Sequence, residues 1–121
     1  MRKKILVIDD EPTVGMLLQF NLQQRGFEVY TADNASDGME IAKNNTIDLF
    51  ILDISIPGTN GIEICKLLRG NPKYSTTPIV MISSKSDEET IKISREAGAN
   101  HYVTKPFVFK EFAKQIESYV K

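Results

Sequence analysis

Four short apolar runs of the sequence each end in polar residues that could take part in chemistry. These polar residues are Asp9, Asp10, Asp53, Ser83, Ser84 and Lys105. If the runs are neighbouring strands of a parallel sheet, their carboxyl ends meet at one edge of the sheet. Two carboxylates about 4 Å apart repel each other by roughly 4 kcal/mol at an effective dielectric near 20. Such a pair must therefore share a proton or hold a cation.

The residue types in this set indicate a hard divalent cation and phosphoryl transfer. The set contains no Cys and no His, and oxygen-only ligands favour Mg²⁺. Lys105 adds a fixed positive charge. A carboxylate beside a divalent cation and an ammonium is suited to attack on a phosphoryl group, because the positive charges neutralise the oxygens of the transition state. The carboxylate can itself be the nucleophile, which gives an aspartyl phosphate.

The elements that must position these residues alternate along the chain. Short apolar runs predict strands at 5–8, 28–31, 49–53, 79–83 and 101–104. Between and after them, apolar residues at helical spacing predict helices at 14–22, 35–42, 62–68, 86–98 and 109–119. Ser86 and Glu89 form the expected capping box of the fourth helix. This alternation predicts an α/β fold with a parallel sheet covered by helices on both faces.

Length and composition limit the classes of function. The 121 residues fit one domain, residues 1–121, and a net charge of −1 argues against a general nucleic-acid coat. The single Cys excludes an intramolecular disulfide, and the single His excludes a His-rich metal site. No apolar run approaches the roughly 18 residues of a membrane span, and no signal peptide is expected. We therefore expect a cytoplasmic domain that binds no membrane and makes no direct contact with nucleic acid.

Four motifs resemble those of the receiver domain of bacterial two-component response regulators, a family that includes single-domain chemotaxis regulators. The motifs are Ile5–Glu11 (ILVIDDE), Leu52–Gly61 (LDISIPGTNG), Ile79–Ser84 (IVMISS) and Gly98–Phe107 (GANHYVTKPF). The resemblance extends over essentially all 121 residues. It implies a doubly wound, flavodoxin-like α/β fold, in which a five-stranded parallel sheet has the strand order 2-1-3-4-5 and is accompanied by five helices.

The resemblance also implies roles for individual residues. Asp53 would be the phosphoacceptor. Asp10 would bind Mg²⁺ directly and Asp9 would bind it through water, with Mn²⁺ as a second cation expected to fit. The implied metal site comprises Asp9, Asp10, Asp53 and the backbone carbonyl of Ser55. Lys105 would pair with the phosphoryl oxygens.

Further roles concern the response to phosphorylation. Ser83 is implied as the switch hydroxyl that moves to the phosphoryl group, with Ser84 beside it as a second phosphoryl-binding residue. Tyr102 would move inward when Ser83 moves, and Tyr102 and Ile91 would belong to the partner face. The peptide bond between Lys105 and Pro106 is expected to be cis.

By the same resemblance, the phosphoryl group would come from a sensor histidine kinase, a phosphotransfer protein or a small phosphodonor. The fourth helix, the fifth strand and the fifth helix would form the face that controls partner binding. The output would be a downstream protein target or a missing C-terminal effector domain. The protein would be a monomer or a weak, phosphorylation-dependent homodimer. It would act on its own Asp53 and not as a turnover enzyme.

Other interpretations of the same residues stay open. Asp9 and Asp10 could simply favour the N-terminus of the first helix, and Ser83 could cap the helix that follows it. Tyr102 could be plain core, and Ile91 could be ordinary exposed surface. A pseudo-receiver that binds proteins without being phosphorylated is the main alternative function. A phosphohydrolase is disfavoured, because it usually needs two Asp separated by one residue, whereas Asp9 and Asp10 are adjacent. A flavin carrier is also disfavoured, because it needs a phosphate-binding loop after the first strand, where the acidic pair would repel the phosphate.

Overall fold

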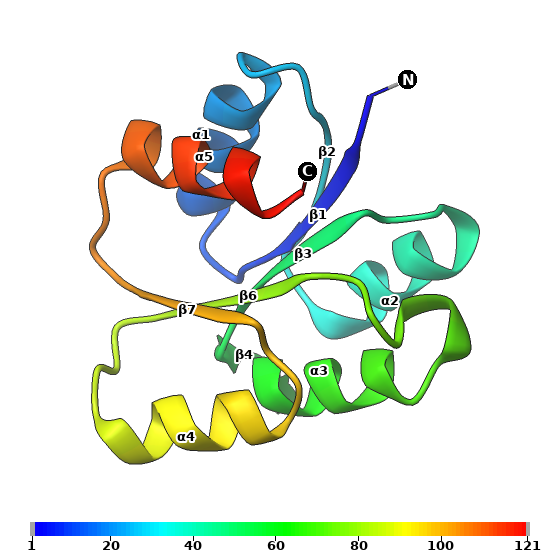
Figure 1. Ribbon diagram of the computed structural model, residues 1–121, viewed down its shortest axis with the longest axis vertical. Helices are drawn as coiled ribbons and strands as arrows, with labels where there is room; N and C mark the ends of the chain where they lie inside the picture. The colour runs from blue at the N-terminus through cyan, green and yellow to red at the C-terminus, as the bar shows by residue number, and fades with distance from the viewer. Residues whose placement is uncertain (1, 121) are drawn as a thin grey trace.

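Continuous apolar runs form the centre of the sheet, because parallel strands with helices on both faces must be apolar on both sides. The computed structural model describes residues 2–120, and its central sheet is parallel, in the order β2-β1-β3-β6-β7 (Figure 1). These strands are β1 (Lys4–Ile8), β2 (Glu28–Ala32), β3 (Leu49–Asp53), β6 (Ile79–Ser83) and β7 (His101–Thr104). Counted along the chain, this is the order 2-1-3-4-5, so the flavodoxin-like fold is confirmed.

Within residues 2–120, five α-helices connect and flank the strands. They are α1 (Pro12–Gln23), α2 (Ala35–Asn44), α3 (Gly61–Arg69), α4 (Glu88–Glu96) and α5 (Phe109–Tyr119), with a short 3₁₀ helix at Pro72–Tyr74. Asn34 and Asn60 cap α2 and α3, since each side chain accepts a hydrogen bond from a backbone N–H in the first turn of its helix. None of the helices within residues 2–120 is both long and apolar enough to cross a membrane.

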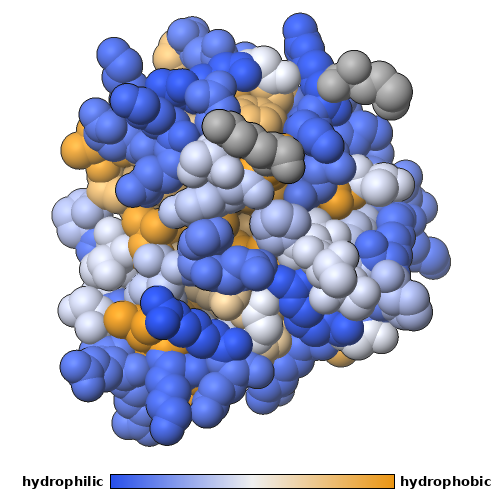
Figure 2. Space-filling model, in the orientation of Figure 1, coloured by the Kyte–Doolittle hydropathy of each residue, from blue (hydrophilic) through white to orange (hydrophobic). Residues whose placement is uncertain are grey.

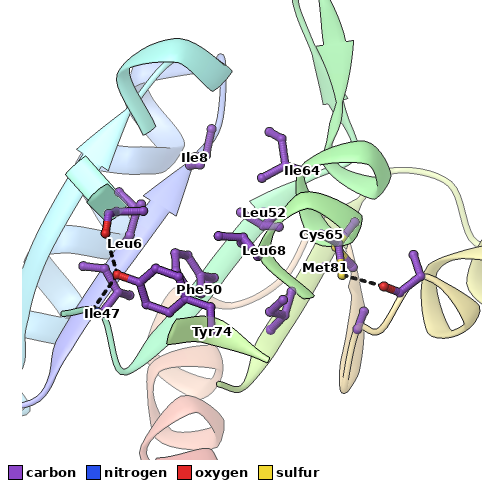
Figure 3. Close-up of a cluster of buried hydrophobic side chains, with 14 of the residues drawn as sticks. Leu6, Ile8, Ile47, Phe50, Leu52, Ile64, Cys65, Leu68, Tyr74 and Met81 are labelled. Carbon is purple, nitrogen blue, oxygen red and sulfur yellow. Dashed lines mark hydrogen bonds between the residues drawn. The ribbon is translucent and has the colours of Figure 1, made fainter. Parts of the chain in front are cut away.

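The helices cover the two faces of the sheet unequally. On one face, α1 and α5 pack against alternate strand residues such as Val7 and Ile51. On the other face lie α2, α3 and α4, as Figure 1 shows. Figure 3 shows this second core, in which the Tyr74 ring meets Phe50 edge-on with centroids 4.9 Å apart. Cys65 is fully buried there, and its thiol donates to the carbonyl of Ala97.

Hydrophilic residues cover most of the surface seen in Figure 2, with smaller apolar patches between them. The apolar runs that predicted strands in the sequence are buried in the two cores on either side of the sheet. Alternate side chains of one strand enter opposite cores, so both layers of helices are needed to cover the sheet. This packing holds the strands rigidly and leaves their carboxyl ends at one edge.

Two local features differ from the sequence-based expectation. The loop after β3 contains a small antiparallel hairpin, β4 (Ser55–Ile56) and β5 (Thr59–Asn60), which was not predicted. Its strands have two residues each, too short for a periodic signal. The expected Ser86–Glu89 capping box is also wrong, because α4 is capped by Asp87, which accepts from the N–H of Thr90 at 2.9 Å. The Asp87 carboxylate both accepts this bond and favours the positive end of the helix.

Candidate functional site

The carboxyl ends of the central strands bring the predicted site residues together. The register pairs Ile8 with Leu52, so Asp9 and Asp53 follow directly at the ends of adjacent strands. One ligand oxygen from each of four acidic residues lies within 4.8 Å of the others; these residues are Asp9, Asp10, Glu11 and Asp53. We refer to these four residues as the acidic cluster. Sheet geometry, and not proximity in sequence, places Asp53 beside the other three.

The Lys105 ammonium neutralises part of the acidic cluster. Its Nζ lies 2.9 Å from Asp9 Oδ2, 3.0 Å from Glu11 Oε1 and 3.1 Å from Asp53 Oδ2. The side chains of Asp9 and Asp53 are 0% and 5% exposed, whereas that of Glu11 is 62% exposed. The ammonium is therefore held by two buried carboxylates and one carboxylate at the surface. The Lys105–Pro106 peptide bond, which leads from β7 toward α5, is cis.

Burial and charge shift the protonation of this group of residues. Burial raises the pKa of Asp53 to about 6; Lys105 and the Ser55 N–H oppose the rise, and the charge of Asp9 adds to it. Burial by itself lowers the pKa of Lys105, but its close contacts with the carboxylates of Asp9, Glu11 and Asp53 outweigh burial and hold that pKa above its ordinary value. Lys105 is thus cationic at neutral pH, next to a carboxylate whose ionisation is costly in the absence of more positive charge.

The acidic cluster fits a hard divalent cation. Asp9 Oδ2 is buried, and no donor within residues 2–120 makes a well-directed hydrogen bond to it, although Lys105 is within ion-pair distance. A buried carboxylate oxygen without a directed donor is costly unless a charge compensates it. The ligands are all oxygens, which is the chemistry that Mg²⁺ prefers. The cluster is therefore consistent with the Mg²⁺ site of a receiver.

The predicted switch residues, Ser83 at the end of β6 and Tyr102 on β7, take part in a small hydrogen-bond network. Ser83 is buried, and its Oγ accepts a hydrogen bond from the backbone N–H of Lys85 at 3.0 Å. The hydroxyl of Tyr102 donates to the backbone carbonyl of the same Lys85 at 2.5 Å. One peptide segment thus contacts both residues. Ser84 is exposed and makes no side-chain hydrogen bond in the part of the chain that the structure describes.

The loop after β3 packs closely against the candidate phosphoacceptor. The backbone N–H of Ser55 donates to Asp53 Oδ1 at 3.1 Å, which fixes the orientation of the carboxylate. Gly61, the first residue of α3, lies so close that a Cβ there would be 2.4 Å from the carbonyl oxygen of Asp53. Only glycine fits without moving the end of β3. A groove of about 570 Å³ adjoins the site, lined in part by Asp10, Ser55 and Lys85.

The predicted partner face lies beside the cluster and outside it. Ile91 is partly buried on α4, and Tyr102 is partly buried on β7. On the same face, the ring of His101 stacks on Tyr119 of α5, with centroids 3.6 Å apart. Burial and the neighbouring Arg95 lower the pKa of His101. The face therefore combines apolar and aromatic side chains from three elements.

Sequence reasoning missed the part that Glu11 plays in the site. The residue belongs to the first motif, yet no role was assigned to it. The structure shows its carboxylate bonded to Lys105, 94 residues later in the chain. Its place directly after Asp10 was the available signal. That signal was weak because an exposed Glu at the start of a helix is ordinarily a favourable helix-end charge.

Comparisons with known proteins agree with this geometry. The family model described as the response regulator receiver domain matches residues 5–117. The chain is 37% identical over 121 residues to the alkaline phosphatase synthesis transcriptional regulatory protein PhoP of Bacillus subtilis. All of this chain is covered, but only 50% of that relative, so the chain spans about half the length of the curated protein.

Solved structures show the same fold. The chemotaxis protein CheY4 of Vibrio cholerae matches with a TM-score of 0.93 and 27% identity, over 98% of this chain and 99% of that one. The BeF₃-activated N-terminal receiver domain of Klebsiella pneumoniae RstA matches with a TM-score of 0.89 and 27% identity, over 98% of each chain. The family match spans every residue of the acidic cluster and Lys105. The chain therefore belongs to the receiver domain family of two-component response regulators, which are signalling modules rather than turnover enzymes.

Proposed function

We propose that the protein is a phosphorylatable switch and that Asp53 is its phosphoacceptor. The donor would be a sensor histidine kinase, a phosphotransfer protein or a small phosphodonor. A carboxylate oxygen of Asp53 bonds to phosphorus as the bond from phosphorus to the donor breaks, and the donor keeps that electron pair. In hydrolysis, a water oxygen bonds to phosphorus and the Asp53 O–P bond breaks. The carboxylate is restored, and inorganic phosphate and a proton leave.

The observation that carries the proposal is the position of Lys105 between the buried carboxylates of Asp53 and Asp9. An ammonium 3.1 Å from the nucleophile can follow the charge onto the phosphoryl oxygens. The Ser55 N–H orients the carboxylate and Gly61 allows the loop to approach it. These contacts are directed at one carboxylate, which distinguishes Asp53 from the exposed Asp10.

A divalent cation belongs to the proposal. Asp10 and Asp53 would bind it directly, Asp9 through water and Ser55 through its backbone carbonyl. Mg²⁺ is the expected ion and Mn²⁺ would also fit the oxygen ligands. When bound, the cation supplies positive charge that offsets both the carboxylates and the phosphoryl oxygens. It would also make the ionised form of Asp53, the nucleophilic form, easier to reach at neutral pH.

The response to phosphorylation would begin at Ser83. Its hydroxyl would exchange the Lys85 N–H for a phosphoryl oxygen, with Ser84 beside it at the same strand end. Because Tyr102 is bonded to the carbonyl of Lys85, a shift of this peptide segment would reach the face formed by α4, β7 and α5. Ile91 and Tyr102 would change their exposure there. Moving such an equilibrium from 1:99 to 99:1 requires about 5.5 kcal/mol, a good part of which charge-assisted bonds to the phosphoryl group could supply.

Receiver membership implies a histidine kinase as partner, and the relative PhoP is a transcriptional regulator. The output of this chain would be a protein target bound by the α4-β7-α5 face or an effector domain joined to the receiver. We propose further that the protein is a monomer or a weak, phosphorylation-dependent homodimer. It would act in the cytoplasm and would bind neither nucleic acid nor membrane directly.

The test is intact-mass measurement after incubation with Mg²⁺ and a small phosphodonor. We expect one phosphoryl adduct that requires Mg²⁺, decays on standing and is missing from Asp53→Asn. An exposed carboxylate variant, Asp33→Asn, serves as the control and should form the adduct normally. Absence of an adduct under every condition would contradict the proposal and favour the pseudo-receiver. The acidic cluster would then be a metal or partner site.

A further inference from the structure

Glu11 holds Lys105 from the solvent side of the site. Its Oε1 accepts a hydrogen bond from Lys105 Nζ at 3.0 Å, while Asp53 Oδ2 accepts another at 3.1 Å. A lysine ammonium has only three N–H donors. Two of them are directed at Glu11 and Asp53, and the ammonium also lies 2.9 Å from Asp9. Two of its three donors are therefore committed to carboxylates before any phosphoryl group arrives, and the third lies near Asp9 without a well-directed hydrogen bond.

The backbone keeps the Glu11 carboxylate available for this contact. Glu11 stands at the N-cap of α1, but its side chain makes no capping bond to the helix. Its N–H donates to Asp9 Oδ1 at 2.8 Å, which ties residue 11 to the buried part of the cluster. The side chain is thus anchored at its base, free of the helix, and directed at Lys105.

From this geometry we infer that Glu11 is a positioning residue that competes with the phosphoryl group for Lys105. The inference rests on the proposed function, since it requires a phosphoryl group on Asp53. That group adds oxygens beside Lys105, and the ammonium can turn more than one donor to them only by releasing a carboxylate. Glu11 is the one to be released, because its side chain is 62% exposed and water can replace its bond at low cost. Glu11 therefore weakens the phosphorylated state relative to the unphosphorylated one.

The experiment measures binding of beryllofluoride, which activates the receiver of Klebsiella pneumoniae RstA. Wild type, Glu11→Gln and Glu11→Asp are titrated by NMR, with Mg²⁺ at saturation for each, so that altered Mg²⁺ affinity does not enter. Glu11→Gln removes the charge and the strong acceptor. Glu11→Asp keeps the charge, but its shorter side chain is diverted from Lys105 to the N-cap position, where Asp is favoured.

We expect Glu11→Gln to bind beryllofluoride at least threefold more tightly than wild type, and Glu11→Asp to show a similar gain. Equal or weaker binding by Glu11→Gln overturns the inference. A Glu11→Asp variant that binds beryllofluoride with wild-type affinity also overturns the inference. The negative charge at residue 11, and not its bond to Lys105, would then account for the difference between wild type and Glu11→Gln. Glu63→Gln removes an exposed carboxylate near the start of a different helix, α3, and should leave the affinity unchanged; an equal gain there also overturns the inference. If wild type itself fails to bind beryllofluoride, the proposed function fails instead.

Discussion

Removing the charge of Asp53 should stabilise the metal-free fold. Burial raises the pKa of this carboxyl to about 6 from its ordinary value of 3.8. A shift of about 2 pKa units corresponds to about 3 kcal/mol, by which the ionised carboxylate destabilises the folded protein. Asp53→Asn keeps the shape and removes that cost. We expect a gain of about 1–3 kcal/mol in the free energy of unfolding, because solvent screening reduces the full cost; the pKa of about 6 already includes the favourable ion pair with Lys105.

The sign of the pH dependence follows from the direction of this shift. Between pH 3.8 and about 6 the folded state binds the Asp53 proton more tightly than the unfolded state does. Wild-type stability relative to the variant therefore rises as the pH falls through 6. The destabilisation is fully present above the folded pKa and is lost below the unfolded pKa. The advantage of Asp53→Asn should be largest above pH 7 and should vanish near pH 4.

Urea unfolding followed by circular dichroism, with a chelator present, measures this difference at pH 7.5, 6 and 4.5. Asp33→Asn, which neutralises an exposed carboxylate, is the matched control and should show no comparable gain. Saturating Mg²⁺ should stabilise wild type more than Asp53→Asn. The reasoning is refuted if Asp53→Asn is less stable than wild type at pH 7.5, or if its advantage persists undiminished at pH 4.5.

Three further changes test other parts of the site and its support. Lys85→Ala should change the lifetime of the phosphoryl group at least twofold, because Lys85 lines the groove beside the acidic cluster; decay of the intact-mass adduct at the wild-type rate would count against this. Asn100→Ala should lower the free energy of unfolding by about 1 kcal/mol, since its Oδ1 accepts from Arg69 and from a backbone N–H of β6, both at 2.9 Å; urea unfolding at the wild-type midpoint would contradict it. Gly61→Ala should both destabilise the protein and slow phosphoryl acceptance, because its Cβ would meet the carbonyl oxygen of Asp53; normal values of both would show that the loop adapts.

Much of the fold could be predicted from periodicity. Strands such as β3 and β6 are continuously apolar, and this pattern is typical of strands covered on both faces. The helices follow from apolar residues at helical spacing. The hairpin β4–β5 and the cap at Asp87 were missed or misassigned, because a few residues of turn geometry carry no periodic signal.

The candidate site, like the fold, could be predicted only in part from the sequence. The types of residues and their positions after the apolar runs predicted carboxylates and an ammonium at the strand ends. Oxygen ligands beside a lysine then indicated a site for a hard divalent cation and phosphoryl transfer. The sequence could not show that Lys105 bonds to Glu11 or that the Lys85 segment joins Ser83 to Tyr102.

The sequence by itself determined which groups are present and which strand end each one follows, because side-chain chemistry and apolar periodicity are local properties. Only the tertiary structure decided their distances, burial and protonation. The pKa of Asp53 depends on the desolvation produced by the packed sheet and on charges far away in the chain. Those terms arise when parallel strands place residues 9, 53 and 105 within a few ångströms of one another.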